Sequence, residues 1–303
     1  MGIREYPQVL LLGNGLNRAY AGSGWGDLIK EIRTNGRINP ESAEFLNAPF
    51  PLQAVLATDD AVDSAIKSNR ESFCGVKEIE ALRPSLTRLL TAGFDHILTT
   101  NYSYELERSA NPRICYDGAG CEKIVQHTDA VKRAEAKFLL HTYNEVSCQG
   151  HKNRIWHIHG EARKPDSIIL GHYYYGKQLN RIQNLLEKQR NKQELREKSG
   201  EPILIQSWVD AFIMGDVYIL GYGFDWSEMD LWWLLNRKKR EKASHGKTVF
   251  YGAAGNCGIK YELLRSYGAE ICNMDFWDKP TDYKQFYEKA IGDIGKRIKK
   301  SED

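Results

Sequence analysis

The stretch VLLLGNGLNR, residues 9–18, is an apolar run that ends in a Gly-x-Gly turn and leads into a helical pattern. The run predicts a buried strand over Gln8–Leu12, and we expect a helix to begin after Gly15. Such a turn lets the backbone approach a ligand, and the N–H groups at a helix N-terminus favour an anion such as a phosphate. An ordinary strand–helix turn has the same pattern, so the rest of the chain has to distinguish the two interpretations.

Length and composition indicate a globular protein. The chain has 303 residues, of which 42% are hydrophobic and 27% charged, with a net charge of +2. The mixed-sign run Glu187–Lys198 and the basic segment 296–300 are typical of solvated helix faces and do not indicate a nucleic-acid site. No apolar stretch reaches membrane-spanning length and no signal peptide is visible, so we expect a cytoplasmic protein. The six cysteines form no C-x-x-C pair, so we expect free thiols and no bound metal.

Strand-like and helix-like segments alternate along the chain, most regularly in the last third. This alternation predicts an α/β fold with a doubly wound, mostly parallel sheet. Further strands are expected at Phe94–Thr100, Arg154–Gly160, Ser167–Gly171, Val217–Leu220, Thr248–Tyr251 and Glu270–Met274. The longest helices are expected over Glu78–Leu90, Tyr175–Lys198 and Tyr283–Lys300. We interpret residues 1–303 as one domain with a helical insertion at about 27–92 and an irregular insertion at about 109–150.

One feature of a simple dinucleotide-binding fold is missing. Such a fold places Asp or Glu at the end of a second strand, about 20 residues after the glycines. Here residues 34–51 carry loop signals, among them Asn35-Gly36 and Pro49-Phe50-Pro51. This pattern argues against a dehydrogenase that transfers a hydride.

Four of the expected strands end in polar residues or glycines. These are Gly13, Asn14, Gly15 and Asn17 at the first end, Thr100 and Asn101 at the second, His157 and His159 at the third, and Gly221 and Gly223 at the fourth. Ligands of parallel α/β sheets bind at the carboxyl ends of the strands, so we expect the four ends to form one site. Structural interpretations remain open as well: Asn101 as a helix N-cap, His159 as a buried core histidine, and the glycines as plain turns.

In this order, the motifs Gly-x-Gly-x-Asn, Thr-Thr-Asn-Tyr, His-x-His-Gly and Gly-Tyr-x-x, the last followed by an acidic helix, resemble those of the sirtuin-like family. The resemblance is to the bacterial branch that lacks the zinc module and acts as an NAD-cleaving effector in antiviral defence. It spans about Leu10 to Leu235. It implies a Rossmann-like fold and an NAD glycohydrolase activity, with NAD+ as substrate and with ADP-ribose and nicotinamide as products.

The resemblance also implies roles for individual residues. Those matched to the binding of NAD are Gly13, Gly15 and Asn17 at the pyrophosphate and Gly221 and Gly223 on the adenosine side, with Asn14, Thr100 and His157 as neighbouring candidates. Asn101 matches the active-site asparagine beside the nicotinamide ribose, and His159 matches the catalytic histidine. The chain departs from the family at Ser103, where an Asp usually helps to hold nicotinamide, so either Ser103 or Glu105 must substitute for it.

The chemistry of NAD cleavage suits Asn101 and His159. Breaking the bond between nicotinamide and ribose builds positive charge on the sugar, as in glycoside hydrolysis, and nicotinamide leaves as a neutral group. An amide can orient a water molecule and the ribose hydroxyls, and a histidine can take up a proton. Two alternatives are an NAD-dependent protein deacylase and a catalytically quiet subunit that binds NAD or ADP-ribose, the latter favoured by Ser103.

An enzyme that destroys NAD needs an off state. We therefore expect control by self-assembly into a homo-oligomer or by a separate partner, and the resemblance suggests a ring-forming ATPase or a phage-sensing protein. The helix over Tyr175–Lys198 and the insertion at about 109–150 are the expected contact surfaces.

Overall fold

The computed structural model describes residues 5–20, 22, 24–69, 79–114, 122–128, 137–199, 204–241, 245–252, 258–274 and 282–300, with the side chains of 189–199 excepted. An eight-stranded sheet runs through this part of the chain in the order β3-β4-β5-β2-β1-β6-β7-β8. Its strands are β1 (Gln8–Leu12), β2 (His96–Thr99), β3 (Val125–Thr128), β4 (Thr142–Cys148), β5 (His151–His157), β6 (Asp216–Leu220), β7 (Thr248–Tyr251) and β8 (Ala269–Cys272). The six strands from β5 to β8 in this order are parallel, and β3 and β4 add an antiparallel edge.

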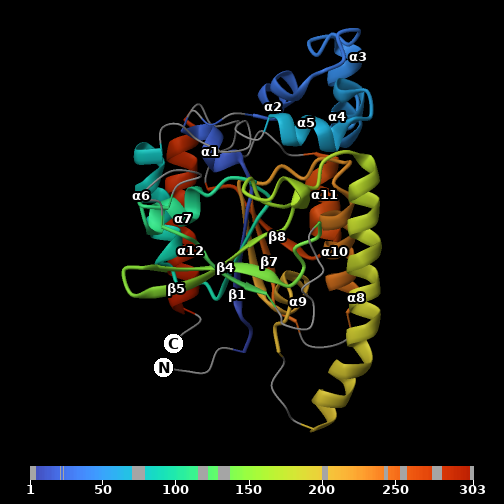
Figure 1. Ribbon diagram of the computed structural model, residues 1–303. Coiled ribbons are helices and arrows are strands. Elements are labelled where there is room, and N and C mark those ends of the chain that lie inside the picture. The colour runs from blue at the N-terminus through green and yellow to red at the C-terminus, as the bar shows by residue number, and fades with distance from the viewer. Residues whose placement is uncertain are drawn as a thin grey trace.

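Helices cover both faces of the sheet, so the expected doubly wound, Rossmann-like α/β architecture is confirmed (Figure 1). One layer consists of α1 (Gly15–Ala19), α6 (Ile79–Leu90), α7 (Glu105–Ala110) and α12 (Tyr283–Lys300). The other consists of α8 (His172–Ser199), α9 (Trp208–Met214), α10 (Met229–Arg240) and α11 (Ile259–Ser266). No described helix combines the length and the hydrophobicity that a membrane crossing requires.

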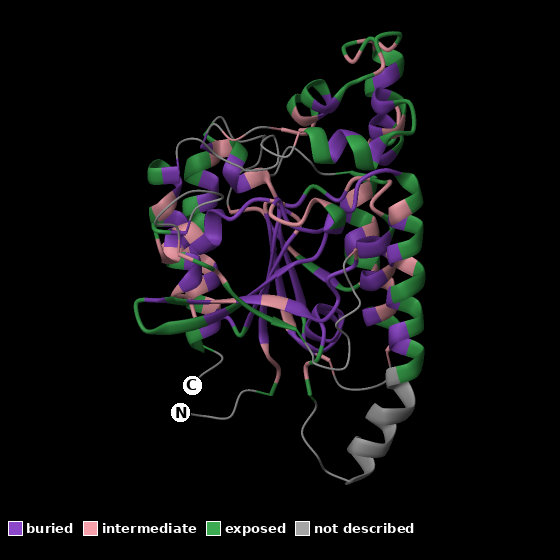
Figure 2. Ribbon diagram, viewed as in Figure 1, coloured by how far each residue is buried: buried purple, intermediate pink, exposed green. Residues whose placement is uncertain are grey.

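The alternation of side chains along the parallel strands builds one core on each face. In β1, Val9 and Leu11 pack into the core that contains α8 to α11, whereas Leu10 and Leu12 pack into the core that contains α6 and α12. Successive side chains of a strand point to opposite faces, so a strand covered on both faces must be apolar throughout. Figure 2 shows these strands buried between the two layers of helices.

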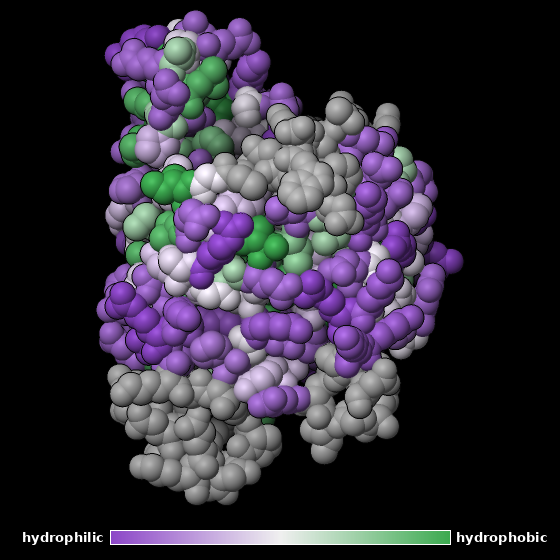
Figure 3. All heavy atoms as spheres, turned by 180° about the vertical axis from the view of Figure 1, so that it is seen from behind, coloured by the Kyte–Doolittle hydropathy of each residue, from purple (hydrophilic) through white to green (hydrophobic). Residues whose placement is uncertain are grey.

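Four short helices form a lobe above the carboxyl ends of the parallel strands (Figure 1). They are α2 (Trp25–Ile32), α3 (Ala43–Leu46), α4 (Phe50–Thr58) and α5 (Val62–Ser68). Their shared core includes Ile29, Phe45 and Ile66, and it reaches Ile168 and Leu170 in the segment beneath the lobe. Seen from behind, hydrophobic residues are visible on the lobe and on the body below it (Figure 3).

Two sequence-based predictions differ from the structure. The insertion at about 109–150 is not irregular throughout, because residues 125–128 form β3 and residues 142–148 form β4. The side chains of β4 are alternately buried, and the two strands extend the sheet beside β5. Residues 167–171, expected to be a strand, lie outside the sheet. Ile168, Ile169 and Leu170 are buried between the body and the lobe. Contact with both explains why this irregular segment is as apolar as a strand.

Candidate functional site

The four strand ends that carry the motifs lie side by side. The strands β5, β2, β1 and β6 are consecutive and parallel in the sheet. Their register is level at this edge, because Leu12 of β1 lies beside Thr99 of β2 and Leu220 of β6, and Thr99 lies beside His157 of β5. Neighbouring strands are about 4.8 Å apart. The residues that follow each strand are therefore brought together beneath the helical lobe (Figure 1).

The Gly-x-Gly turn after β1 packs directly against the turn after β6. The N–H group of Gly13 donates to the carbonyl oxygen of Leu220 at 2.9 Å, and the N–H group of Gly15 donates to that of Gly221 at 2.7 Å. A Cβ atom on Gly13 would lie 2.5 Å from the Gly221 oxygen, and Gly221 itself has a positive φ of 68°. These glycines are thus required by backbone packing. The N–H groups of Gly13 and Gly15, which would otherwise suit a pyrophosphate, are already paired.

The glycine after Tyr222 has no such packing role. Gly223 is exposed, and a Cβ atom on it would meet nothing within 4 Å. Its carbonyl oxygen accepts a hydrogen bond from the ammonium group of Lys260 at 3.0 Å. The space beside Gly223 is therefore open for its expected contact with the adenosine side of a ligand.

Two asparagines at neighbouring strand ends have polar side-chain groups without partners. Asn17 is buried in α1, and its Oδ1 atom bonds no group in the described ranges. Asn101 follows β2, where its backbone N–H donates to Thr99 Oγ1 at 3.1 Å. Its side-chain amide forms no hydrogen bond with a described residue, although Asn101 is only 9% exposed. Thr100, which precedes Asn101, is half-buried, and its N–H donates to the Leu12 carbonyl at 3.3 Å.

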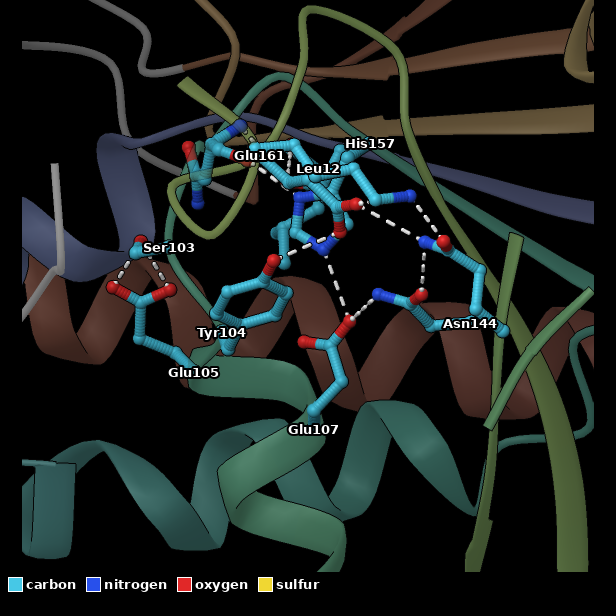
Figure 4. Close-up of polar contacts among 12 residues, drawn as sticks. Leu12, Ser103, Tyr104, Glu105, Glu107, Asn144, His157 and Glu161 are labelled. Carbon is cyan, nitrogen blue, oxygen red and sulfur yellow. Dashed lines mark hydrogen bonds and ion pairs between the residues drawn. The ribbon is translucent and has the colours of Figure 1, made fainter. Parts of the chain in front are cut away.

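His157, at the end of β5, is fully enclosed (Figure 4). Its Nδ1 lies 2.9 Å from the backbone oxygen of Asn101, and its Nε2 lies 2.9 Å from Glu107 Oε1 on α7. Burial alone would lower the pKa of His157, but the carboxylates of Glu107 and Glu161 raise it to about 9. The ring is therefore an imidazolium at neutral pH that donates through both nitrogens. Both ring nitrogens of His157 are thus paired with protein groups, which leaves neither of them for the expected contact with NAD.

The carboxylates beside His157 belong to a wider buried network (Figure 4). Glu107 Oε1 also accepts from the Asn144 amide of β4 at 2.9 Å. Glu161 accepts from the Tyr104 hydroxyl at 2.9 Å and from the Gln126 amide at 3.0 Å. Buried charges persist only when they are paired and hydrogen-bonded, so this network fixes the relative positions of α7, β4 and β5.

His159, two residues further on, has a different environment. Its Nε2 lies 2.9 Å from Oδ2 of Asp230 in the first turn of α10, and both side chains are buried. Burial lowers the pKa of His159, but Asp230 outweighs this effect and the net shift is upward. The ring of Tyr175 packs edge-on against the imidazole, with centroids 5.3 Å apart. The second nitrogen, Nδ1, forms no hydrogen bond with any described residue, which leaves it able to take a proton.

A second carboxyl group that the sequence analysis missed lies near this pair. Glu228 precedes α10, and its Oε2 accepts from the N–H of Asp225 at 3.0 Å. Burial raises the pKa of Glu228 to about 7, against the opposing effects of His159 and the Tyr222 hydroxyl. The only signal in the sequence was the acidic character of the helix that follows Gly221. That signal did not show which carboxylate faces His159.

The position that departs from the family pattern is occupied by a paired hydroxyl. Ser103 donates to the carboxylate of Glu105, and both residues are buried. Figure 4 shows this pair on the side of α7 away from the Asn144 end of the network. Glu105 therefore places a carboxyl group next to the hydroxyl of Ser103.

No protein-family model matches the sequence, and no match was found among curated proteins. Within the described ranges, no three His, Cys, Asp or Glu side chains lie together as a metal site would require. We therefore infer the function from the geometry of Asn101, His159 and their neighbours.

Proposed function

We propose that the chain is an NAD glycohydrolase, which uses water to cleave NAD+ into ADP-ribose, nicotinamide and a proton. The observation that carries the proposal is the contrast between paired and unpaired groups at one edge of the sheet. Both ring nitrogens of His157 and the hydroxyl of Ser103 are paired, whereas the Asn101 amide and the His159 Nδ1 bond no described residue. These two groups follow neighbouring strands, β2 and β5.

Each unpaired group suits one part of the reaction. The amide of Asn101 offers both a donor and an acceptor, which can orient the ribose hydroxyls and the attacking water. Nδ1 of His159 can accept the proton that this water loses as its oxygen bonds to the sugar carbon. Nicotinamide leaves as a neutral group when the C–N bond breaks, so no general acid is needed for its departure. Burial strengthens the electrostatic interactions of both side chains with a developing positive charge.

The test is the release of nicotinamide from NAD+ by the purified full-length protein. We expect Asn101→Ala and His159→Ala each to lower the rate by at least about 100-fold while the circular dichroism spectrum is unchanged. Matched controls are His151→Ala on the exposed start of β5 and Asn184→Ala on the exposed face of α8, which should retain full activity. Full activity in either site variant would refute the assigned roles.

Two further arms distinguish the alternatives. Nicotinamide release that depends strictly on an acyl-lysine peptide would indicate a protein deacylase. Binding of ADP-ribose by calorimetry, with no nicotinamide release from the protein alone, as a homo-oligomer or with products of neighbouring genes, would indicate a quiet binding subunit. Either result would replace the hydrolase proposal.

In a cell, such an activity would deplete NAD+, which fits an effector of antiphage defence. The proposal includes control by self-assembly or by a partner such as a ring-forming ATPase, because unregulated NAD+ cleavage would harm its host. Native mass spectrometry of the protein alone and with products of neighbouring genes would identify the assembly.

A further inference from the structure

The carboxylate beside His159 is held in place from two sides. Oδ2 of Asp230 accepts from Nε2 of Gln178 on α8 at 2.8 Å as well as from His159, and Oδ1 accepts from the N–H of Leu231 at 2.9 Å. Gln178 also donates to the carbonyl oxygen of Ile158 at 3.2 Å. Asp230 is 0% exposed and Gln178 is 1% exposed. The carboxylate of Asp230 can therefore neither rotate freely nor exchange its partners for water.

This arrangement decides which ring nitrogen of His159 carries the proton. A carboxylate that accepts three hydrogen bonds is kept ionised, and the pKa of Asp230 is lowered by His159 against the opposing effect of burial. An ionised carboxylate accepts but cannot donate, so the nitrogen that faces it must be protonated. That nitrogen is Nε2, at 2.9 Å. The neutral ring then has its lone pair on Nδ1.

We propose that Asp230 is the positioning residue of His159, which fixes the Nε2–H form of the ring and leaves Nδ1 to accept a proton, with Gln178 fixing Asp230 in turn. The proposal deepens the function proposed above and rests on it for the role of His159 as a base. When Nδ1 takes a proton from water, the water oxygen bonds to the sugar carbon and the C–N bond to nicotinamide breaks. The ring is then an imidazolium whose charge Asp230 balances, and the proton leaves to solvent afterwards.

The proposal differs from a merely structural role for Asp230 in what it predicts for the ring. Among the residues that the structure describes, the ionisable groups that face His159 are Asp230 and Glu228 from the start of α10 and the Tyr175 phenol from α8. Among them, Asp230 has the largest effect in raising the pKa of His159. Removing the charge of Asp230 should therefore lower the pKa of His159. The neutral ring should then no longer prefer the Nε2–H form.

The first experiment is spectroscopic and needs no turnover. The imidazole nitrogens of the full-length protein are labelled with ¹⁵N, and the His159 signals are identified by their loss in His159→Gln. We expect the neutral ring of the wild type to show the Nε2–H form. Asp230→Asn should give a lower His159 pKa and a mixture of both neutral forms, and Asp230→Glu should keep the wild-type form. A wild-type ring protonated at Nδ1, or unchanged His159 signals in Asp230→Asn, would overturn the proposal.

The second experiment is kinetic. Asp230→Asn should lower kcat for nicotinamide release by about 10²–10⁴-fold with little change in KM, and should shift the pH dependence of the remaining rate to lower pH. The matched control is Asp216→Asn at the opposite end of β6; the Asp216 carboxylate is likewise hydrogen-bonded, by Gln8 and by Lys247. It should leave kcat and the His159 signals unchanged. A wild-type kcat in Asp230→Asn would overturn the proposal.

The two experiments separate the proposals from one another. If the wild type releases no nicotinamide, the proposed function fails, and the ring signals still decide whether Asp230 sets the form of His159. If the wild type is active and its ring is protonated at Nδ1, the hydrolase proposal stands and the role of Asp230 falls.

Discussion

Nδ1 of His157 lies 2.9 Å from the backbone carbonyl oxygen of Asn101, so a buried imidazolium joins the end of β5 to the end of β2. The second nitrogen of the same ring is bonded to Glu107 on α7. Two histidines of one motif therefore have separate tasks. His157 holds the backbone of Asn101, and His159 keeps one ring nitrogen unpaired.

We expect His157→Leu to reduce both stability and activity. The substitution leaves the buried carboxylate of Glu107 without its cation, which costs about 3–5 kcal/mol when one partner of such a pair is removed. It also removes the hydrogen bond that holds the backbone of Asn101 in place, so the rate of nicotinamide release should fall. The measurement is urea unfolding of the wild type, both single variants and the pair His157→Leu/Glu107→Leu. The double variant should lose less free energy of unfolding than the two single variants together. Strictly additive losses would contradict the ion pair between His157 and Glu107.

Stability should depend on pH through the same histidine. The pKa of His157 is about 9 in the folded protein and 6.5 ordinarily, so the folded state binds the proton more tightly. Its contribution is complete below about pH 6.5 and is lost as the pH rises through about 9. The free energy of unfolding should therefore fall between pH 7 and pH 9.5 more steeply in the wild type than in the variant pair. Parallel slopes for the two proteins would show that His157 is not held as an imidazolium.

Much of the parallel core could be predicted because its strands are continuous apolar runs. The structure has β1 at Gln8–Leu12, β7 at Thr248–Tyr251 and α12 at Tyr283–Lys300, as expected from the sequence. The prediction was wrong at residues 167–171, where an irregular segment is buried from two sides and is as apolar as a strand. It also missed β3, whose residues are exposed, and β4, whose alternating pattern is a weaker signal than a buried apolar run.

The candidate site could be predicted in its positions but not in its contacts. Asn101 and His159 follow apolar runs, and that local signal is enough to place them at strand ends. The carboxylates that face the two histidines are remote in sequence: Glu107 is 50 residues from His157, and Asp230 is 71 residues from His159. A pattern read along one chain contains no information about which distant carboxylate faces which ring, so the different roles of the two histidines emerged only from the structure.

The turn after β1 should tolerate no side chain at Gly13. We expect Gly13→Ala to destabilise the fold by about 1–3 kcal/mol or more, because the new methyl group would collide with the backbone of Gly221. The control is Gly176→Ala inside α8, where a Cβ atom meets nothing within 4 Å and should stabilise the helix by about 0.5–1 kcal/mol. Thermal unfolding of both variants tests the comparison. A Gly13→Ala protein as stable as the wild type would disprove the backbone packing.

A buried lysine on α10 stabilises the far end of the fold. Nζ of Lys238, whose pKa burial lowers to about 7, donates hydrogen bonds to the carbonyl oxygens of Phe212, Gly215 and Lys247. Lys238→Met leaves these buried acceptors without a donor, and we expect a loss of about 1–3 kcal/mol in urea unfolding. Lys239→Met, at the exposed neighbouring position, should change stability by less than about 0.5 kcal/mol. Equal effects of the two substitutions would show that the hydrogen bonds of Lys238 to these carbonyl oxygens do not stabilise the fold.

Glu228 should influence the reaction through its charge. Because burial raises its pKa to about 7, the folded state favours the protonated form, and its ionisation costs stability as the pH rises from 4.5 through 7. We expect Glu228→Gln to lose less stability than the wild type between pH 5 and pH 8. Since the Glu228 carboxylate also raises the pKa of His159, the rise in nicotinamide release with pH should move to lower pH in this variant. Glu262→Gln on the exposed face of α11 serves as the control and should change neither curve. Unchanged pH dependence of both stability and rate in Glu228→Gln would mean that this carboxyl group does not titrate beside His159.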